Sequence, residues 1–417
     1  MDYIDISAHT ALAFPQKISS QGIASQATVQ KGSTIDWENR TVGNGVFAAS
    51  GTTSFGQVDF GQVDFGQKVR AYRQMTQALP NSHEAWSHLG YYLAQVQDYQ
   101  AAVGAYAQSL YLKANAPRIW YNYATLLEKL GWYGESVSSY EQALVISPSY
   151  FKAMSGKSKN LYKLGRYQEA VASYEQSLRN PLATGTNAAE LWYGRGKALM
   201  KRKRIEQAVE SFEKALVISP QSHKIWASLG QALSLQQKDA AALTKFEKAL
   251  RLEPRSALYW THKGFLLKRL GRYEEALSAF DEAIFLEPMA ARAWHHRGLT
   301  LMNMKRYSDA HDSFTWALKH QAYDYRSWLS LGWSLEKMGD YAQAIEAYNK
   351  SLSIEPDQSF AFYRQARCYA ILQKNHLALE HLRRAIALDP ESYVERAQAD
   401  PAFRHVRDKA VLAPAIA

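Results

Sequence analysis

The stretch that decides the fold is ALYWTHKGFLLKRLGRYEEALSAFDEAIFLEPMA at residues 257–290, followed directly by ARAWHHRGLTLMNMKRYSDAHDSFTWALKHQAYD at residues 291–324. Both stretches are 34 residues long, and both carry Trp at position 4, Gly at position 8, Ala at position 20 and Phe at position 24. Positions 4 and 8 share one face of a helix, and positions 20 and 24 share one face of a second helix. The pattern therefore predicts a repeated helix–turn–helix unit.

The residue at position 4 recurs every 34 residues on both sides of these two units, except for one step of 38 residues. Small residues at positions 8, 20 and 27 allow two helix backbones to approach closely, and the aromatic residue at position 24 fills the space beside them. We expect these residues to form the core, and we expect the four extra residues, around residues 180–190, to lengthen a loop. The residues at position 4 are Trp86, Trp120, Met154, Trp192, Trp226, Trp260, Trp294, Trp328 and Phe362.

This pattern closely resembles the tetratricopeptide-repeat (TPR) family. The resemblance implies an all-α fold, a right-handed α-solenoid of about nine 34-residue helix–turn–helix repeats with capping helices. Residues 83–390 would hold the nine repeats, residues 67–82 an N-terminal capping helix (half a repeat), and residues 391–417 a C-terminal capping helix and tail. Residues 1–66, with FGQVD twice in succession and then FGQ, are expected to be a largely disordered low-complexity segment. The repeats would begin near residues 83, 117, 151, 189, 223, 257, 291, 325 and 359.

Composition limits the class of protein. The net charge is +10, yet residues 1–66 hold three basic and six acidic residues, so the positive excess belongs to the rest of the chain. A basic body favours acidic partners. The sequence contains no run of about 18 apolar residues, so it predicts no transmembrane segment. The first residues do not resemble a signal peptide, and we therefore expect a cytoplasmic protein. Cys368 is the only cysteine, which excludes an internal disulfide.

In the TPR family the first helix of each repeat lines the concave surface, and positions 2, 5, 9, 12 and 13 usually face it. In this sequence those positions hold cations interleaved with tyrosines, and in repeats 2 to 5 the only acids among them are Glu128 and Glu190. The resemblance therefore implies a basic groove that binds a partner, and His295 lies further along the same surface. The expected groove residues are Arg118, Tyr121, Lys129, Lys152, Lys159, Tyr162, Lys163, Tyr193, Lys197, Lys201, Lys224, Lys268, Arg292 and Arg326.

The sequence contains parts of two catalytic motifs, and both are incomplete. Gly156-Lys157-Ser158 lacks the glycine that a phosphate-binding loop needs five residues earlier, and His83-Glu84 lacks the second histidine of a zinc-protease helix. His295 and His296 are adjacent, so they point in different directions, and we expect them on the surface without a third metal ligand. Because the repeats use nearly all of the folded chain, we predict no enzyme, no catalytic residue, no cofactor, no metal site and no small-molecule substrate.

The favoured function is a non-catalytic protein–protein interaction scaffold or assembly adaptor. Its partner would be an acidic or phosphorylated segment, or a helix with an acidic face, because Lys supplies charge and Arg grips a carboxylate or phosphate with two hydrogen bonds. The alternative is an RNA-binding helical-repeat protein that uses the same basic, Tyr-containing groove. RNA is the less favoured partner, because Lys outnumbers Arg in the groove and no repeating base-reading code is visible.

Overall fold

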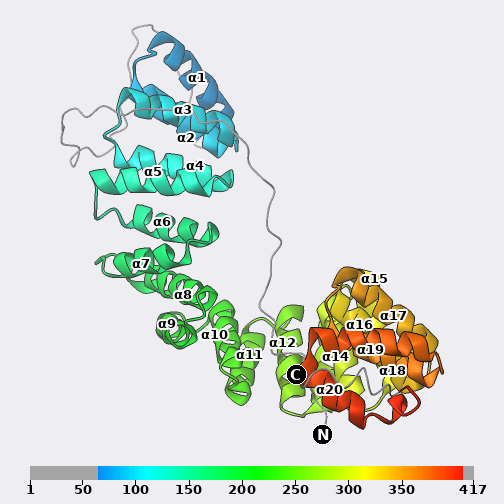
Figure 1. The fold of residues 1–417 in the computed structure, drawn as a ribbon. Coiled ribbons are helices and arrows are strands. Elements are labelled where there is room, and N and C mark those ends of the chain that lie inside the picture. The colour runs from blue at the N-terminus through cyan, green and yellow to red at the C-terminus, as the bar shows by residue number, and fades with distance from the viewer. Residues whose placement is uncertain (1–63, 407–417) are drawn as a thin grey trace. The chain divides into compact units, whose positions relative to one another are not determined.

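The computed structural model describes residues 64–406, and within them it shows twenty α-helices, one short 3₁₀-helix and no strand (Figure 1). The expectations for residues 1–63 and 407–417 lie outside the described residues. None of the described helices combines the length and the hydropathy that crossing a membrane requires. The helices are α1 (Phe65–Ala78), α2 (His83–Gln95), α3 (Tyr99–Leu112), α4 (Pro117–Lys129), α5 (Tyr133–Ile146), α6 (Phe151–Lys163), α7 (Tyr167–Leu178), α8 (Gly185–Lys201), α9 (Ile205–Ile218), α10 (His223–Leu235), α11 (Asp239–Leu252), α12 (Ala257–Arg269), α13 (Tyr273–Leu286), α14 (Ala291–Asn303), α15 (Tyr307–His320), α16 (Tyr325–Met338), α17 (Tyr341–Ile354), α18 (Ser359–Ile371), α19 (Asn375–Leu388), α20 (Pro390–Ala399) and η1 (Pro401–Phe403).

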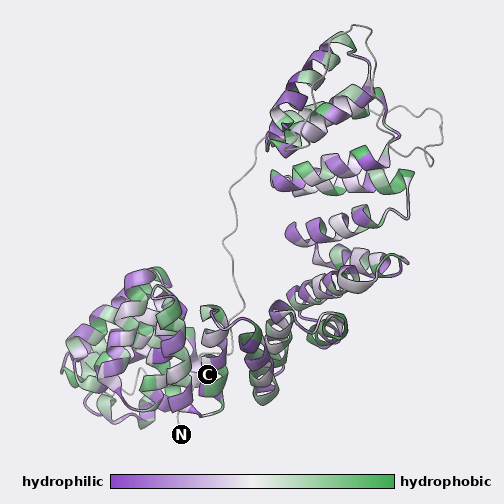
Figure 2. Ribbon diagram, turned by 180° about the vertical axis from the view of Figure 1, so that it is seen from behind, coloured by the Kyte–Doolittle hydropathy of each residue, from purple (hydrophilic) through white to green (hydrophobic). Residues whose placement is uncertain are grey.

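The helices pack in the order of the chain. Each even-numbered helix from α2 to α18 pairs with the odd-numbered helix that follows it, and each pair stacks on the next pair. Most helices show both hydrophobic and hydrophilic residues, as expected of a helix with one buried face (Figure 2). This arrangement confirms the predicted all-α repeat solenoid, whose buried residues form several clusters along the array.

In the six repeats that have glycine at position 8 of the first helix, this glycine makes a close contact with the aromatic ring at position 24 of the second. A Cβ atom at Gly264 would lie 2.6 Å from Cε1 of Phe280, and one at Gly332 would lie 2.6 Å from Cε1 of Tyr348. The small residues at positions 20 and 27, such as Ala276 and Ala283, have no exposed surface. The aromatic ring of the second helix therefore lies directly against the backbone of the first, which only glycine or another small residue at position 8 permits.

The tryptophan at position 4 does more than fill space. Its side chain is only partly buried, and its indole N–H donates to the carbonyl oxygen that ends the preceding repeat, for example from Trp260 to Pro254 at 2.9 Å. The same bond recurs at the same spacing from Trp86, Trp120, Trp226, Trp294 and Trp328, at 2.8–3.0 Å. The indole thus fixes the turn between repeats, a role that the expectation of a purely apolar core did not include.

The turn inside each repeat places position 15 in the left-handed region of backbone conformation. Four repeats have glycine there, and five have a residue with a side chain, for which this conformation is unfavourable. Lys305, for instance, has φ 61°, whereas Gly271 has φ 74° at the same position of the neighbouring repeat. The glycines are Gly131, Gly165, Gly271 and Gly339, and the other residues are Gln97, Lys203, Gln237, Lys305 and Gln373.

The four extra residues mainly extend a helix, contrary to the expectation of a longer loop. Helix α8 has 17 residues, against 13 in α6 and in α10, because it begins at Gly185, before the repeat start expected near residue 189. Asn180 organises the turn before α8: its side-chain oxygen accepts from the N–H of Leu182 at 2.9 Å, and its amide donates to the carbonyl of Ser149 at 3.0 Å. The insertion is therefore an ordered part of the stack.

The C-terminal end of the array is covered by α20 and η1. Tyr363 of α18 packs against the rings of Tyr393 and Phe403, with ring centroids 5.0 and 5.7 Å away. The hydroxyl of Tyr363 donates to Oδ2 of Asp400 at 2.8 Å, and Nε of Arg367 donates to the same oxygen at 3.1 Å. Two hydrogen bonds from α18 therefore hold the covering segment in place.

Enlarging glycine at position 8 should destabilise the protein. We expect Gly264→Ala to lower the free energy of unfolding by about 1–2 kcal/mol, since the clash with Phe280 outweighs the better helix propensity of alanine. The matched control is Gly104→Ala in α3, where a Cβ atom would meet nothing within 4 Å, so this change should add about 0.5–1 kcal/mol. Urea unfolding of both variants checks this, and equal effects would contradict the described packing.

Exchanging the residue at position 15 should change stability in opposite directions in two neighbouring repeats. Lys305→Gly removes the strain of a residue with a side chain in the left-handed conformation. Gly271→Lys introduces that strain, because φ is 74° at Gly271, and it adds no clash, because a Cβ atom there would meet nothing within 4 Å. We expect a gain and a loss of about 1 kcal/mol respectively. Thermal unfolding followed by circular dichroism measures both, and a loss on Lys305→Gly would show that its side chain matters more than its backbone.

Candidate binding surface

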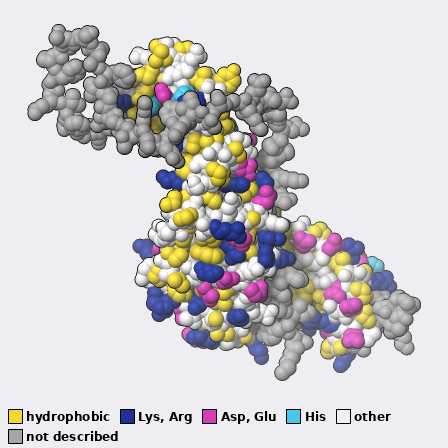
Figure 3. All heavy atoms as spheres, turned by 90° about the vertical axis from the view of Figure 1, so that its left-hand side faces the viewer, with side chains coloured by type: hydrophobic (Ala, Val, Ile, Leu, Met, Phe, Trp, Pro, Cys, Tyr) yellow, Lys and Arg dark blue, Asp and Glu magenta, His cyan; other side chains and the backbone are white. Residues whose placement is uncertain are grey.

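The even-numbered helices of neighbouring repeats lie closer together than the odd-numbered ones. The contacts that skip one helix, such as α4 with α6 and α12 with α14, join even-numbered helices. The first helix of each repeat therefore lies on the inner side of the local curve. All fourteen residues of the expected groove are on these even-numbered helices. Figure 3 shows one face of the molecule, on which basic and acidic side chains are interspersed along the array.

Two of the expected groove lysines are already paired. Nζ of Lys163 lies 2.8 Å from Oε1 of Glu128, and Nζ of Lys159 lies 3.0 Å from Oε2 of Glu190. Each ion pair joins successive first helices, α4 with α6 and α6 with α8. The two acids singled out in the sequence therefore partly neutralise these two lysines. Such exposed pairs add little stability, but they reduce the net charge that a partner meets in this region.

Lys197 occupies the next position along the surface and lies on aromatic rings. Its Nζ is 4.8 Å from the ring centroid of Tyr162 and 5.5 Å from that of Tyr193. Burial, together with the neighbouring positive charge of Lys201, lowers the pKa of Lys197. The structure thus brings Tyr162, Tyr193, Lys197 and Lys201 together. Two neighbouring positive charges on an aromatic surface favour the binding of an anion.

Tyr121 is part of the wall of the surface. Its ring lies against Tyr140 and Tyr150, with centroids 5.8 and 5.4 Å away, and burial raises its pKa. Lys129 also contacts a ring, with Nζ 4.7 Å from the centroid of Tyr99. Of the expected cations, Arg118, Lys152, Lys224 and Arg292 are exposed.

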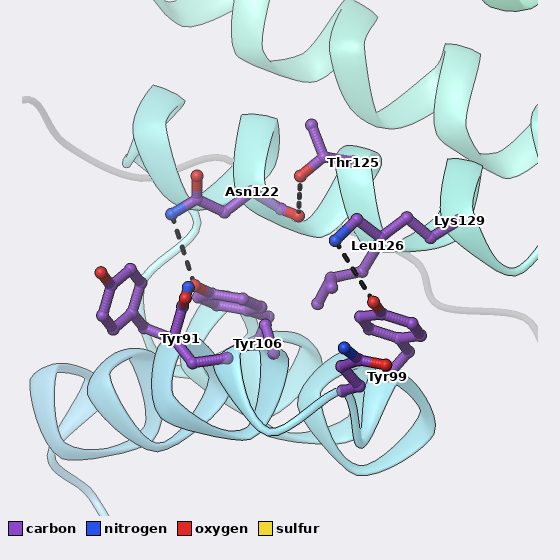
Figure 4. Close-up of a pocket in the computed structure, with 10 residues that line it drawn as sticks. Tyr91, Tyr99, Tyr106, Asn122, Thr125, Leu126 and Lys129 are labelled. Carbon is purple, nitrogen blue, oxygen red and sulfur yellow. Dashed lines mark hydrogen bonds between the residues drawn. The ribbon is translucent and has the colours of Figure 1, made fainter. Parts of the chain in front are cut away.

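A hollow of about 360 Å³ lies between α2, α3 and α4, at the start of this surface (Figure 4). Tyr91, Tyr99, Tyr106, Asn122 and Lys129 line it, and Asn122 Nδ2 donates to the hydroxyl of Tyr106 at 3.4 Å. Burial raises the pKa of Tyr106 to about 12, so its hydroxyl stays protonated. The hollow offers hydrogen-bonding groups and ring edges, and Lys129 supplies its positive charge.

A second group of cations lies on α12, α14 and α16. Lys268 Nζ is 5.5 Å from the ring centroid of Phe265, and Arg326 Nε donates to the hydroxyl of Tyr325 at 3.2 Å. His295 and His296 lie between these cations, and they are partly buried against rings, so the expectation that they sit on the surface is wrong. The centroid of His295 is 5.7 Å from that of Phe314, and the centroid of His296 is 5.3 Å from that of Phe265.

Sequence reasoning missed a buried charge network near the end of the surface. Glu336 of α16 is almost fully buried and pairs with Arg364 and Arg367 of α18, and its Oε2 accepts from the hydroxyl of Tyr348 at 3.0 Å. Cys368 lies nearby, and its own burial raises the pKa of its thiol to about 12, which makes the thiol unreactive. The sequence does contain a signal for this network. Glu336 stands at position 12 of the first helix of one repeat, and Arg364 and Arg367 stand at positions 6 and 9 of the first helix of the next repeat.

Among the described residues, no group of three or more His, Cys, Asp or Glu side chains is placed to hold a metal ion. The described surface therefore offers charges, rings and hydrogen-bonding groups spread along successive helices. Such a surface suits recognition of an extended partner, with many weak contacts in series.

Comparison with solved structures returns other helical-repeat proteins. The chain is 16% identical to a tetratricopeptide repeat protein from Parabacteroides merdae, covering 59% of this chain and 96% of that one, with a TM-score of 0.48. It is 23% identical to PilF from Pseudomonas aeruginosa, covering 52% and 100%, with a TM-score of 0.47. It is 21% identical to YrrB, titled a TPR protein with an unusual peptide-binding site, covering 46% and 97%, with a TM-score of 0.40. No curated protein sequence matches the chain.

Two family models match the sequence. Residues 117–150 match a tetratricopeptide repeat, which corresponds to α4 and α5. Residues 149–402 match the family described as the cilia and flagella-associated protein 70 C-terminal domain, and this match takes in more than half of the 417 residues. It runs from the start of α6 to η1. The chain is therefore a tetratricopeptide-repeat protein that belongs to the family of the cilia and flagella-associated protein 70 C-terminal domain.

Proposed function

We propose that the chain is a non-catalytic scaffold that binds an acidic or phosphorylated segment of another protein along its even-numbered helices. The TPR fold is a scaffold for protein–protein interaction, and no enzyme family is indicated for this chain. The finer part of the proposal, the acidic partner, rests on charge. We also expect the partner to be met in the cytoplasm, as the sequence suggests.

The observation that carries the proposal is the position of Lys197. This cation lies over the rings of Tyr162 and Tyr193 and beside the charge of Lys201, and its pKa is lowered. A lowered lysine pKa means that the charged form is destabilised, and a bound anion would remove that penalty. Because Glu128 and Glu190 are already paired with other lysines, an acidic group from a partner is the natural counter-charge.

The surroundings of Lys197 support an extended partner. The paired lysines of α6 lie on one side of it, and exposed Lys224 of α10 lies on the other. Half-buried tyrosines between the cations provide rigid contact area with little loss of side-chain entropy. An acidic segment that follows successive first helices would therefore meet a cation or a ring at each repeat.

Replacing the central cations should weaken binding of an acidic probe. We expect Lys197→Gln/Lys201→Gln in the full chain to weaken binding of a rhodamine-labelled octa-aspartate peptide at least ten-fold at pH 7.5, which is about 1.4 kcal/mol. The physical reason is the loss of two charged contacts, one of them from the half-buried Lys197. Fluorescence anisotropy at fixed ionic strength measures the affinity, and the same titration with a phosphoserine peptide compares the two kinds of acidic group.

The control carries the same change of charge on the odd-numbered helices. Lys248→Gln/Lys350→Gln alters exposed lysines of α11 and α17, and it should change the affinity less than two-fold. If both double variants weakened peptide binding equally, the net charge of the protein would explain the effect, and a site on the even-numbered helices would be contradicted. Tighter binding of a single-stranded RNA oligonucleotide that also depends on Lys197 and Lys201 would favour the RNA alternative instead.

A further inference from the structure

A hydrogen-bonded series of polar groups crosses from α14 to α16. Oγ of Ser327 donates to Oδ2 of Asp324 at 2.5 Å, and Nδ1 of His295 lies 2.8 Å from the same Ser327 oxygen. Since the single hydroxyl proton of Ser327 goes to the carboxylate, the proton between Ser327 and His295 must belong to the imidazole. Nδ1 of His295 is therefore protonated, and Nε2 is the atom that can gain or lose a proton.

Asp324 is committed to the start of α16. Its carboxylate also accepts from the backbone N–H groups of Arg326 and Ser327, at 3.3 and 3.2 Å. These two bonds and the one from the Ser327 hydroxyl would have to rearrange before Asp324 could pair directly with a nearby cation. The negative charge closest to His295 is thus held by the backbone of α16.

The charges that face His295 are predominantly positive. Lys268 comes from α12, Arg292 from α14 and Arg326 from α16, whereas Asp324 is the one acid that acts on it among the described residues. The other titratable neighbour from α14 is His296. From α15 the neighbour is the uncharged ring of Phe314. On the α12 side, His262 stacks on Phe246 and faces the same Arg292.

The histidines are consequently held neutral. Burial, followed by the cations and only partly offset by Asp324, lowers the pKa of His295 from 6.5 to about 4. Burial and Arg292 lower the pKa of His262 to about 4, and burial and the nearby positive groups lower the pKa of His296 well below its ordinary value. A negative charge brought to this place would oppose these cations and favour the protonated imidazole.

We propose that α12, α14 and α16 form a second anion site for the acidic partner, in which Lys268, Arg292 and Arg326 attract a carboxylate and His295 takes up a proton as that carboxylate binds. The proposal rests on the proposed function, because it assumes an acidic partner on the even-numbered helices. The proton comes from solvent and adds to Nε2 of His295, where it creates a further cation and a further donor toward the bound carboxylate. Binding at this site is therefore coupled to pH.

The sign of this coupling follows from the two states of the histidine. Without a ligand, His295 stays neutral from pH 7.5 down to pH 5.5, because its pKa is about 4. If the bound carboxylate restores the ordinary pKa of 6.5, the complex gains about 0.9 proton at pH 5.5 and almost none at pH 7.5. Affinity should then be about ten-fold higher at pH 5.5 than at pH 7.5.

The test uses the full chain and the rhodamine-labelled octa-aspartate peptide, whose side chains stay ionised over this pH range. Anisotropy titrations at pH 5.5 and 7.5 and constant ionic strength should give the ten-fold difference for the unaltered protein. His295→Gln should abolish the difference. Calorimetry at pH 5.5 in two buffers with different ionisation enthalpies should count the proton directly.

Two further variants keep the test decisive. Arg292→Gln changes an exposed side chain, so it should fold normally, weaken binding and shrink the pH dependence. His381→Gln is the matched control, because it removes a half-buried histidine of α19 away from the cluster, and the pH dependence should be unchanged.

The outcomes separate this inference from the proposed function. Binding that is lost in Lys197→Gln/Lys201→Gln but keeps its full pH dependence in His295→Gln and Arg292→Gln would overturn the second site alone. Binding that shows no pH dependence in the unaltered protein would also overturn it. Failure of the peptide to bind at either pH would overturn both proposals.

Discussion

The contact on which the whole array depends is the one between the backbone at position 8 and the aromatic ring at position 24. The ring of Phe280 lies against Gly264 where even a methyl group would not fit, and similar contacts recur in other repeats. Because the two helices of a pair touch at this point, the spacing of every later layer follows from it. The groove inherits this spacing, since its side chains project from the same first helices that carry the glycines. Packing density in the core thus sets the distance between successive binding groups.

The sequence predicted the elements that periodicity controls, and it missed those that depend on partners distant in the chain. Glycine and alanine at positions 8 and 20 were enough to locate the helix pairs, because the period repeats so often. The ion pairs of Lys159 and Lys163 were not predicted, since each joins residues of different repeats whose facing depends on side-chain rotamers. The extra residues before α8 were read as a loop because Pro, Gly and Asn usually end helices, whereas here they precede an extended helix.

His295 and His296 show why burial could not be read from helical position alone. Adjacent residues on a helix point in different directions, which made a surface position reasonable for both. The relevant surroundings come from other helices: His295 packs against Phe314 of α15 in the same repeat, and His296 packs against Phe265 of α12 in the preceding repeat. The local charge at a point on the binding surface therefore depends on which side chains of three successive repeats lie together there. The net charge of +10 does not predict this local charge.

The covered C-terminal end has a consequence for self-association. Solenoids with a bare apolar end can stack head to tail, because the first helix of one copy can continue the last layer of another, and such contacts propagate into filaments. Here Tyr393 and Phe403 fill the place that an added layer would take, and Asp400 binds Tyr363 and Arg367 of α18. Addition of another copy at this end would first have to expel a segment held by hydrogen bonds, so the end of α18 and α19 is closed to open-ended growth.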